Sequence, residues 1–193
     1  RYISVTGVQT CALPIFHVAI IKRDHVFGHV CKTTCMISIE KALRHMAWSN
    51  QLVFQEVSKL PEDIYGLTAA EGEWPVGRIL THFIGAAEWY KYCSTGVKWE
   101  DYIPIKDHQI LLAEAKRLAT LDEILIKQAS REDEICTFED ESSTNRVLLS
   151  VILAQAVNHT AEHKAQLSTI LKMHGHHLDL DNKDVWAYES SIK

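Results

Sequence analysis

The chain has 193 residues and a mass of 22.0 kDa, which is enough for one domain. Apolar residues make up 47% of the sequence and charged residues 23%, a mixture typical of globular proteins and unlike that of disordered chains. The formal net charge of −5 gives no basic stripe, so we expect no nucleic-acid partner. No run of about 18 apolar residues occurs, so the sequence predicts no transmembrane helix and no membrane partner.

The first 35 residues differ in composition from the rest. They hold three of the five cysteines but only one of the 25 acidic residues. Within them, residues 5–15 (VTGVQTCALPI) resemble the in-frame translation of a sequencing adapter. We therefore expect residues 1–35 to be a leader that is not part of the fold. The domain is then residues 36–193, which carry 16 basic and 24 acidic groups and a net charge of −8.

Other interpretations of this leader stay open. It could be a genuine N-terminal helix, or residues 12–21 could be a signal-peptide core, although a proline and a histidine interrupt them and no small-residue cleavage site follows. Soft ligands for a zinc ion also occur there, without a C-x2-C pair: His25, His29, Cys31 and Cys35. Only Cys93 and Cys136 remain after the leader, which favours the cytoplasm and no disulfides.

The domain begins with two predicted helices. Apolar residues recur at three- and four-residue spacing from Ser38, and the pattern ends before Pro61. A second helix begins at Pro75, which the first turn tolerates, and runs to about Cys93. Because it is apolar on most sides, we expect it to be central in the fold.

The second half of the domain predicts two further long helices. The third spans roughly residues 107–130, and residues 135–138 form a short extended piece in an acidic loop without a strong hairpin signal. The fourth helix is capped by Ser143 or Thr144 and continues to His174.

A last short helical segment holds residues 185–188. Four long helices without repeats or an interdomain linker predict an all-α fold, a four-helix bundle with a short C-terminal helix.

Histidines interrupt the predicted core face of two helices. His159 and His163 lie one turn apart on the stripe of the fourth helix that should be buried. Neighbouring buried imidazoles without partners are costly, and a metal ion can take one nitrogen from each. His82, at a core-facing position of the second helix, offers a third ligand. Three ligands with an open position are typical of a catalytic metal site; the alternative is three partly exposed or hydrogen-bonded histidines.

Four segments resemble motifs of the DinB-like (damage-inducible) metal-binding proteins. Residues 79–90 (ILTHFIGAAEWY) are similar to the second-helix motif and residues 158–167 (NHTAEHKAQL) to the fourth-helix motif. Residues 47–50 (AWSN) and 184–188 (DVWAY) resemble the first-helix and C-terminal signatures. The resemblance covers residues 36–193.

This resemblance implies a DinB/YfiT-like four-helix bundle with a divalent metal, Zn²⁺ or Ni²⁺, held by His82, His159 and His163. Members of the family often form homodimers, and characterised relatives include metal-dependent transferases of low-molecular-weight thiols, a thiol-dependent isomerase and hydrolases. Glu162 and Ala165 depart from the commonest pattern, in which histidine and glycine occupy these positions, so the subfamily stays open.

We therefore expect a metal-dependent enzyme that transfers a low-molecular-weight thiol to a small electrophilic substrate, with Glu162 as the candidate base. Three alternatives stay open. The same ion could activate water for hydrolysis, the domain could be a non-enzymatic stress-related bundle that binds metal or small molecules, or it could be a structural dimer whose histidines bind nothing.

Residues 159–163 also read H-x-x-E-H, the signature of inverzincin metalloproteases. Such an enzyme would need a further acidic ligand, for which the sequence offers Asp179, Asp181, Asp184 and Glu189.

Several polar and aromatic residues near the motifs have two interpretations each. His45 could face the metal cavity or lie in the core, and Asn158 and Gln166 could orient a histidine or be surface amides. Tryptophans could line a substrate pocket or fill the core: Trp48, Trp89 and Trp186.

Overall fold

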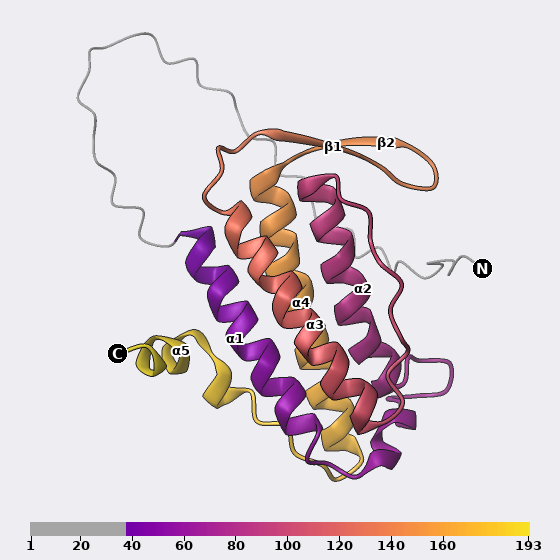
Figure 1. The fold of residues 1–193 in the computed structure, drawn as a ribbon. Helices are drawn as coiled ribbons and strands as arrows, with labels where there is room; N and C mark the ends of the chain where they lie inside the picture. The colour runs from indigo at the N-terminus through magenta and orange to yellow at the C-terminus, as the bar shows by residue number, and fades with distance from the viewer. Residues whose placement is uncertain (1–37) are drawn as a thin grey trace, which may run out of the picture. The chain divides into compact units, whose positions relative to one another are not determined.

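Four long helices make up most of the computed structural model, which describes residues 38–193 (Figure 1). Helix α1 spans Ile39–Val57, α2 spans Val76–Thr95, α3 spans His108–Gln128 and α4 spans Leu149–Met173. The predicted bounds of α1, α2 and α3 are confirmed to within a few residues. The predictions about the leader, including its candidate zinc ligands, lie outside the described residues.

Local capping explains where these helices begin and end. The Ser38 side chain accepts a hydrogen bond from the Lys41 N–H at 3.2 Å, and Asp107 accepts one from the Ile110 N–H at 2.8 Å. Each bond satisfies a backbone donor that the first turn leaves free. Gly96 ends α2 with a φ of 74°, a left-handed conformation that favours glycine.

The mostly helical structure fits the all-α prediction, and a small two-stranded antiparallel sheet adds to it. Strand β1 (Ile135–Glu139) pairs with β2 (Thr144–Leu148), so that Ile135 lies opposite Leu148. The fold is therefore mostly helical with one β-hairpin between α3 and α4. The predicted start of the fourth helix was wrong, because the chain is still extended at residue 144 and α4 begins five residues later.

The turn of the hairpin accounts for this error. Asp140 accepts hydrogen bonds from the backbone N–H groups of Ser142 and Ser143 at 2.8 and 2.7 Å. Short polar side chains that cap helices also close turns in this way. The polar run therefore reverses the chain, and Ser143 does not cap α4.

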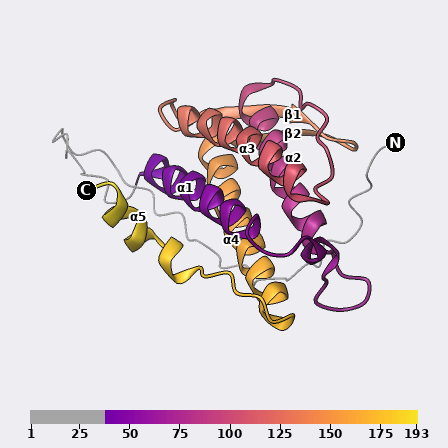
Figure 2. The same ribbon diagram turned by 60° about the horizontal axis from the view of Figure 1, so that its bottom comes forward.

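The helices pack so that α1 and α2 each contact both α3 and α4 (Figures 1 and 2). The hairpin lies across one end of α2 and α4, with β1 against α2 and β2 against α4. The short C-terminal helix α5 (Val185–Ser191) was predicted and lies beside α1. Two 3₁₀-helices complete the described elements, η1 (Glu62–Gly66) against α2 and η2 (Asp181–Lys183) before α5.

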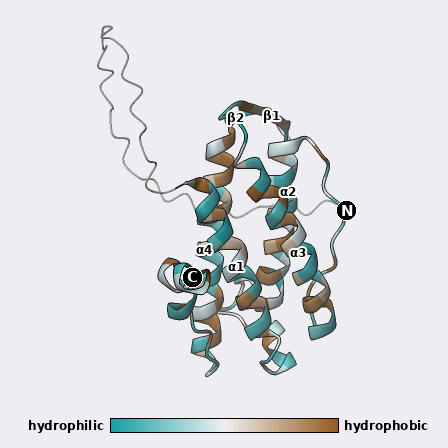
Figure 3. Cartoon of the chain, turned by 60° about the vertical axis from the view of Figure 1, so that its left-hand side comes forward, coloured by the Kyte–Doolittle hydropathy of each residue, from teal (hydrophilic) through white to brown (hydrophobic). Residues whose placement is uncertain are grey.

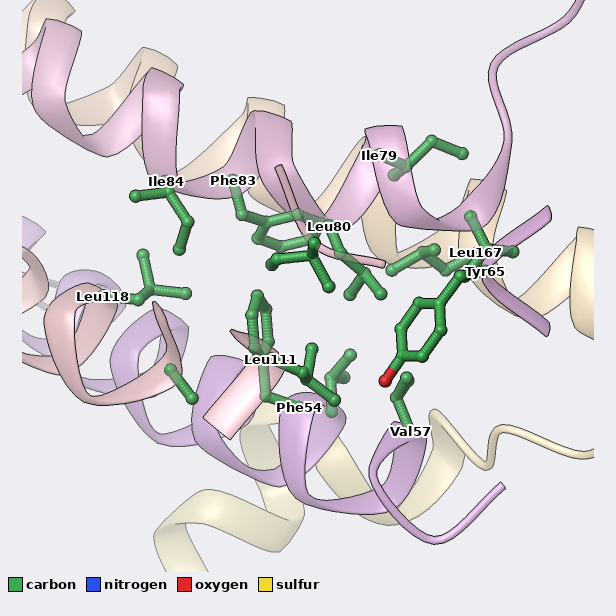
Figure 4. Packing of buried hydrophobic residues seen from close by; sticks show 14 of the residues in the cluster. Phe54, Val57, Tyr65, Ile79, Leu80, Phe83, Ile84, Leu111, Leu118 and Leu167 are labelled. Carbon is green, nitrogen blue, oxygen red and sulfur yellow. The ribbon is translucent and has the colours of Figure 1, made fainter. Parts of the chain in front are cut away.

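All four long helices are amphipathic, with apolar and polar residues side by side along each (Figure 3). Figure 4 shows the larger core cluster, where Phe54 of α1 meets Phe83 of α2 edge to face at a centroid distance of 5.7 Å. Leu118 of α3 and Leu167 of α4 close the same cluster and are at most 1% exposed. Within residues 38–193, no helix is long and apolar enough to cross a membrane.

Helix α4 contributes to two separate core clusters. Its apolar residues up to Ala156 belong to the cluster near the hairpin, and those from Leu167 onward belong to the larger cluster. His159 and His163 lie between the two and are half-buried. The predicted stripe of α4 is thus confirmed, and its two imidazoles occupy the break between its apolar halves.

Candidate metal centre

The structure brings together the three histidines that the sequence singled out. His82 comes from α2, and His159 and His163 come from successive turns of α4. The Nε2 atom of His159 lies 3.0 Å from Nε2 of His82 and 3.1 Å from Nε2 of His163. All three nitrogens therefore point at one small volume between two neighbouring helices.

These distances fit the size of a metal ion. Two nitrogens that each lie about 2.0–2.1 Å from one ion are about 2.9–3.4 Å apart at octahedral or tetrahedral angles. No carboxylate or thiol joins the three imidazoles among the residues the structure describes. The group therefore has the composition and spacing of a three-histidine metal site.

The surroundings of the site favour the neutral forms of His82 and His159, and metal ligation requires neutral imidazole. Burial, with the neighbouring His163 and Arg78, lowers the pKa of His82 to about 4. Burial, with His163 and His82 close by, lowers the pKa of His159 to about 4 as well. Burial disfavours the charged form of each of these two rings, and positive charge nearby disfavours it further, so their neutral forms are favoured.

A hydrogen bond fixes the third imidazole. The Nδ1 atom of His163 lies 2.9 Å from Oε1 of Gln166, one turn further along α4. The carbonyl oxygen accepts, so Nδ1 carries the proton and Nε2 keeps its lone pair toward the site. Of the two amides named from the sequence, Gln166 therefore contacts a site histidine, whereas Asn158 is exposed on α4.

Aromatic side chains surround the three rings. Trp74 lies edge-on to His82 at 5.0 Å and parallel to His163 at 6.4 Å, and Tyr90 meets His159 edge-on at 5.8 Å. Sequence reasoning missed Trp74, because it precedes α2 and no helical spacing connects it to the histidines. Its position next to the proline that begins α2 was the one available signal.

The tryptophans named from the sequence lie elsewhere. Trp48 packs against His45 and Tyr188, and Trp89 packs against Trp99 and other aromatic residues near the hairpin. Trp186 on α5 is 83% exposed.

His45 also lies apart from the site. Its Nε2 atom is 2.9 Å from the backbone carbonyl of Lys183, so it connects α1 to the C-terminal segment.

The acidic candidates do not join the histidines. Glu162 is exposed on α4. Of the downstream residues that an inverzincin would need, Asp184 caps α5 by accepting from the Ala187 N–H at 2.7 Å, and Glu189 pairs with Lys41. Within residues 38–193 the group of possible ligands contains histidines alone, which disfavours the metalloprotease interpretation.

The two cysteines of the described chain lie in surroundings that favour the thiol form. Cys93 and Cys136 are buried and form no disulfide. Burial raises the pKa of the Cys93 thiol to about 12 and also raises the pKa of Cys136. Since the thiolate is the nucleophile, burial disfavours the reactive form of both side chains.

The fold and the site together define a class: helical proteins in which three imidazoles from two helices converge. The sequence matches the DinB family over residues 32–186. The chain belongs to the DinB family. The segments around His82, His159 and His163, residues 79–90 and 158–167, resemble motifs of this family.

A solved structure has a similar fold. The crystal structure of a DinB-like protein from Bacillus cereus ATCC 10987 superimposes with a TM-score of 0.56 at 19% sequence identity. The match covers 71% of this chain and 91% of that one. Among curated proteins, none matches the sequence.

Proposed function

We propose that His82, His159 and His163 bind one divalent metal ion, Zn²⁺ or Ni²⁺, through their Nε2 atoms. The observation that carries this proposal is the convergence of three imidazole nitrogens, with the Nε2 atom of His159 3.0 Å and 3.1 Å from those of the other two rings. Without an ion, neighbouring rings can be joined only by single N–H···N hydrogen bonds. Imidazole nitrogen suits both metals.

Metal analysis of the purified protein tests this proposal. We expect about one equivalent of metal in the wild type and a large loss in His159→Ala. His177→Ala is the matched control, because His177 is an exposed histidine beyond the end of α4. If His159→Ala kept its full metal content, the proposed ligand set would be wrong.

We further propose that the protein transfers a low-molecular-weight thiol to a small electrophile. A bound divalent ion would supply the positive charge that deprotonates a thiol at neutral pH. The sulfur then bonds to the electrophilic carbon, the leaving atom takes the electron pair of the broken bond, and the thiol proton passes to solvent.

The chain's own residues support an external thiol as the nucleophile. Cys93 is buried with a pKa of about 12, so the reacting sulfur cannot come from it. Three protein ligands leave coordination positions for a substrate, and the aromatic rings of Trp74 and Tyr90 lie beside the histidines. Glu162, next to His163 in sequence and exposed on α4, is the candidate base that would pass the thiol proton to solvent, and Glu162→Gln would test this role.

A panel of cellular thiols with an electrophile tests the transferase proposal. The metal-loaded protein should consume thiol and electrophile in equal amounts, and His82→Ala should abolish this consumption. Thiol loss that persists in His82→Ala would refute the transferase. Hydrolysis of ester or amide substrates without thiol loss would point to a hydrolase, and neither reaction in metal-loaded protein would point to a binding protein.

We also propose a DinB-type four-helix bundle that works as a homodimer in the cytoplasm. Helices α1 and α2 each packed on α3 and α4 support the bundle, and the reduced Cys93 and Cys136 suit a reducing compartment. Light scattering of the full chain tests the dimer. A monomer at micromolar concentration would contradict it.

A further inference from the structure

Trp74 and Arg78 adjoin the three histidines on one side. The Arg78 guanidinium carbon lies 4.3 Å from the centroid of the Trp74 ring. The same ring lies 5.0 Å from His82 and parallel to His163. Two consecutive contacts therefore lead from a guanidinium to the candidate metal ligands.

The fold holds both side chains in place. Arg78 and His82 are four residues apart on α2 and share one face of the helix. Trp74 belongs to the loop before α2, and the Val76 N–H donates to the Leu67 carbonyl at 2.9 Å, which closes this loop. The cation and its aromatic support are thus positioned by the start of the helix that carries His82.

Among the described residues, nothing accepts a hydrogen bond from the guanidinium of Arg78. Three other arginines of the described chain form ion pairs, such as Arg44 with Glu40 and Arg117 with Glu88. Within residues 38–193, the Arg78 side chain has no carboxylate within 4.0 Å and donates no hydrogen bond. A cation–π contact occupies one face of a guanidinium, while its donors lie in the plane of the group.

Lys164 provides a contrast. It follows His163 on α4, but its ammonium group donates to Ser49 Oγ and to the Met46 carbonyl of α1. This cation is therefore directed into the protein and away from the histidines. Of these two, Arg78 is the exposed one that a ligand at the three histidines can reach.

We propose that Arg78, supported by Trp74, forms an anion subsite that binds the carboxylate of the thiol substrate while its sulfur faces the three histidines. The proposal rests on the proposed function, which it deepens by naming the substrate class: thiols with a carboxylate a few bonds from sulfur. A planar guanidinium binds a carboxylate through two parallel hydrogen bonds. The net charge of −8 over residues 36–193 repels anions, so a local cation is needed to attract one.

The test compares two thiols that differ in one group, N-acetylcysteine and N-acetylcysteine amide. Co²⁺-loaded protein is titrated with each, and the thiolate-to-cobalt absorption band gives the dissociation constant. We expect Arg78→Gln to weaken the binding of N-acetylcysteine about 10-fold and the binding of the amide less than about 2-fold. The two thiols also differ in thiol acidity, and this difference cancels when the variant is compared with the wild type for each thiol.

Controls separate the subsite from a general effect. Arg78→Lys should recover part of the binding, and Arg146→Gln should change nothing, because Arg146 is an exposed arginine of β2. Metal content should stay at the wild-type level in all three variants. If Arg78→Gln weakened the binding of both thiols equally, or of neither thiol, the subsite proposal would be wrong while the thiol transferase proposal would stand.

A thiol-free pair tells the two proposals apart. N-acetylalanine and its amide are titrated into the same proteins by calorimetry. If no thiolate band forms but N-acetylalanine binds in an Arg78-dependent manner, the subsite holds and the thiol chemistry fails. If no thiolate band forms and N-acetylalanine binds equally well with and without Arg78, both the subsite proposal and the thiol transferase proposal are overturned.

Discussion

The side-chain oxygen of Gln166 lies 2.9 Å from Nδ1 of His163, so one helical turn of α4 carries both a candidate ligand and the group that orients it. The bond sets which nitrogen of His163 is protonated and limits rotation of the ring. Partners of this kind affect metal affinity without touching the metal.

Removal of this partner should weaken metal binding. We expect Gln166→Ala to lower the affinity for Zn²⁺ by about 10–100-fold, measured by competition with a chromogenic chelator. Gln166→Glu, which still accepts from Nδ1, should retain most of the affinity. Gln109→Ala on the exposed side of α3 is the control. Unchanged affinity in Gln166→Ala would mean that the bond is not formed in the metal-bound protein.

The sequence predicted the part of this site that depends on local spacing. His159 and His163 share a face because residues four apart in a helix do so, and His82 falls on the core face of α2 for the same reason. It could not distinguish Gln166 from Asn158, because both flank a histidine and the choice depends on side-chain rotamers.

Long-range contacts account for what the sequence did not predict. Trp74 reaches the histidines because the loop before α2 closes on Leu67. The hairpin after α3 lacks the Asn-Gly or Asp-Gly turn that usually identifies one, and its turn depends on Asp140, whose role is visible only once the strands are paired.

Gly77 permits a close approach between α2 and the loop that follows it. A Cβ atom on Gly77 would lie 2.5 Å from the Ile105 carbonyl oxygen and 3.2 Å from that of Tyr65. The Ile105 N–H also donates to Thr81 Oγ1 at 2.8 Å, which fixes this segment against the turn next to His82.

A methyl group at this position should therefore destabilise the protein. Gly77→Ala should lower the free energy of unfolding by about 1–3 kcal/mol, although alanine favours helix more than glycine does. Gly66→Ala is the matched control, because a Cβ there meets no atom within 4 Å. Urea unfolding measures both, and equal stabilities would show that the loop moves aside without cost.

Glu88 is a buried carboxylate with two cationic partners. It is 2% exposed and lies 2.5 Å from both Lys91 Nζ and Arg117 Nη2. Burial raises its pKa, but the bonds and charges of Lys91 and Arg117 outweigh burial, so the pKa of Glu88 is lowered. Arg117 also donates to the carbonyls of Glu100 and Asp101, which connects this ion pair to the loop after α2.

Neutralising Glu88 leaves Lys91 as a buried cation without a counterion. We expect Glu88→Gln to cost about 3–5 kcal/mol of unfolding free energy and to increase proteolytic cleavage in the loop at residues 97–106. Glu132→Gln, at an exposed position, should change stability by less than about 0.5 kcal/mol. A stable Glu88→Gln variant with an intact loop would show that Lys91 and Arg117 find other partners.

Asp122 of α3 gives the protein a pH-dependent stability. It is 1% exposed and accepts a hydrogen bond from Asn50 Nδ2 at 2.9 Å. Burial raises the pKa of Asp122 from 3.8 to about 7, although Asn50 and the positive charge of Lys164 on α4 oppose this shift and Glu123 adds to it. The folded state therefore binds a proton that the unfolded chain has already lost between about pH 4 and pH 7.

The stability that protonated Asp122 contributes is fully present below pH 4 and is lost as the pH rises toward 7. Asp122→Asn keeps the acceptor for Asn50 but cannot titrate, so its stability relative to the wild type should rise over that range by up to about 1.4 kcal/mol per unit of pKa shift. Urea unfolding of both proteins at several pH values gives the difference, in which the titration of histidines common to both cancels. Two parallel curves would show that Asp122 is already ionised at pH 4, with Lys164 as its counterion.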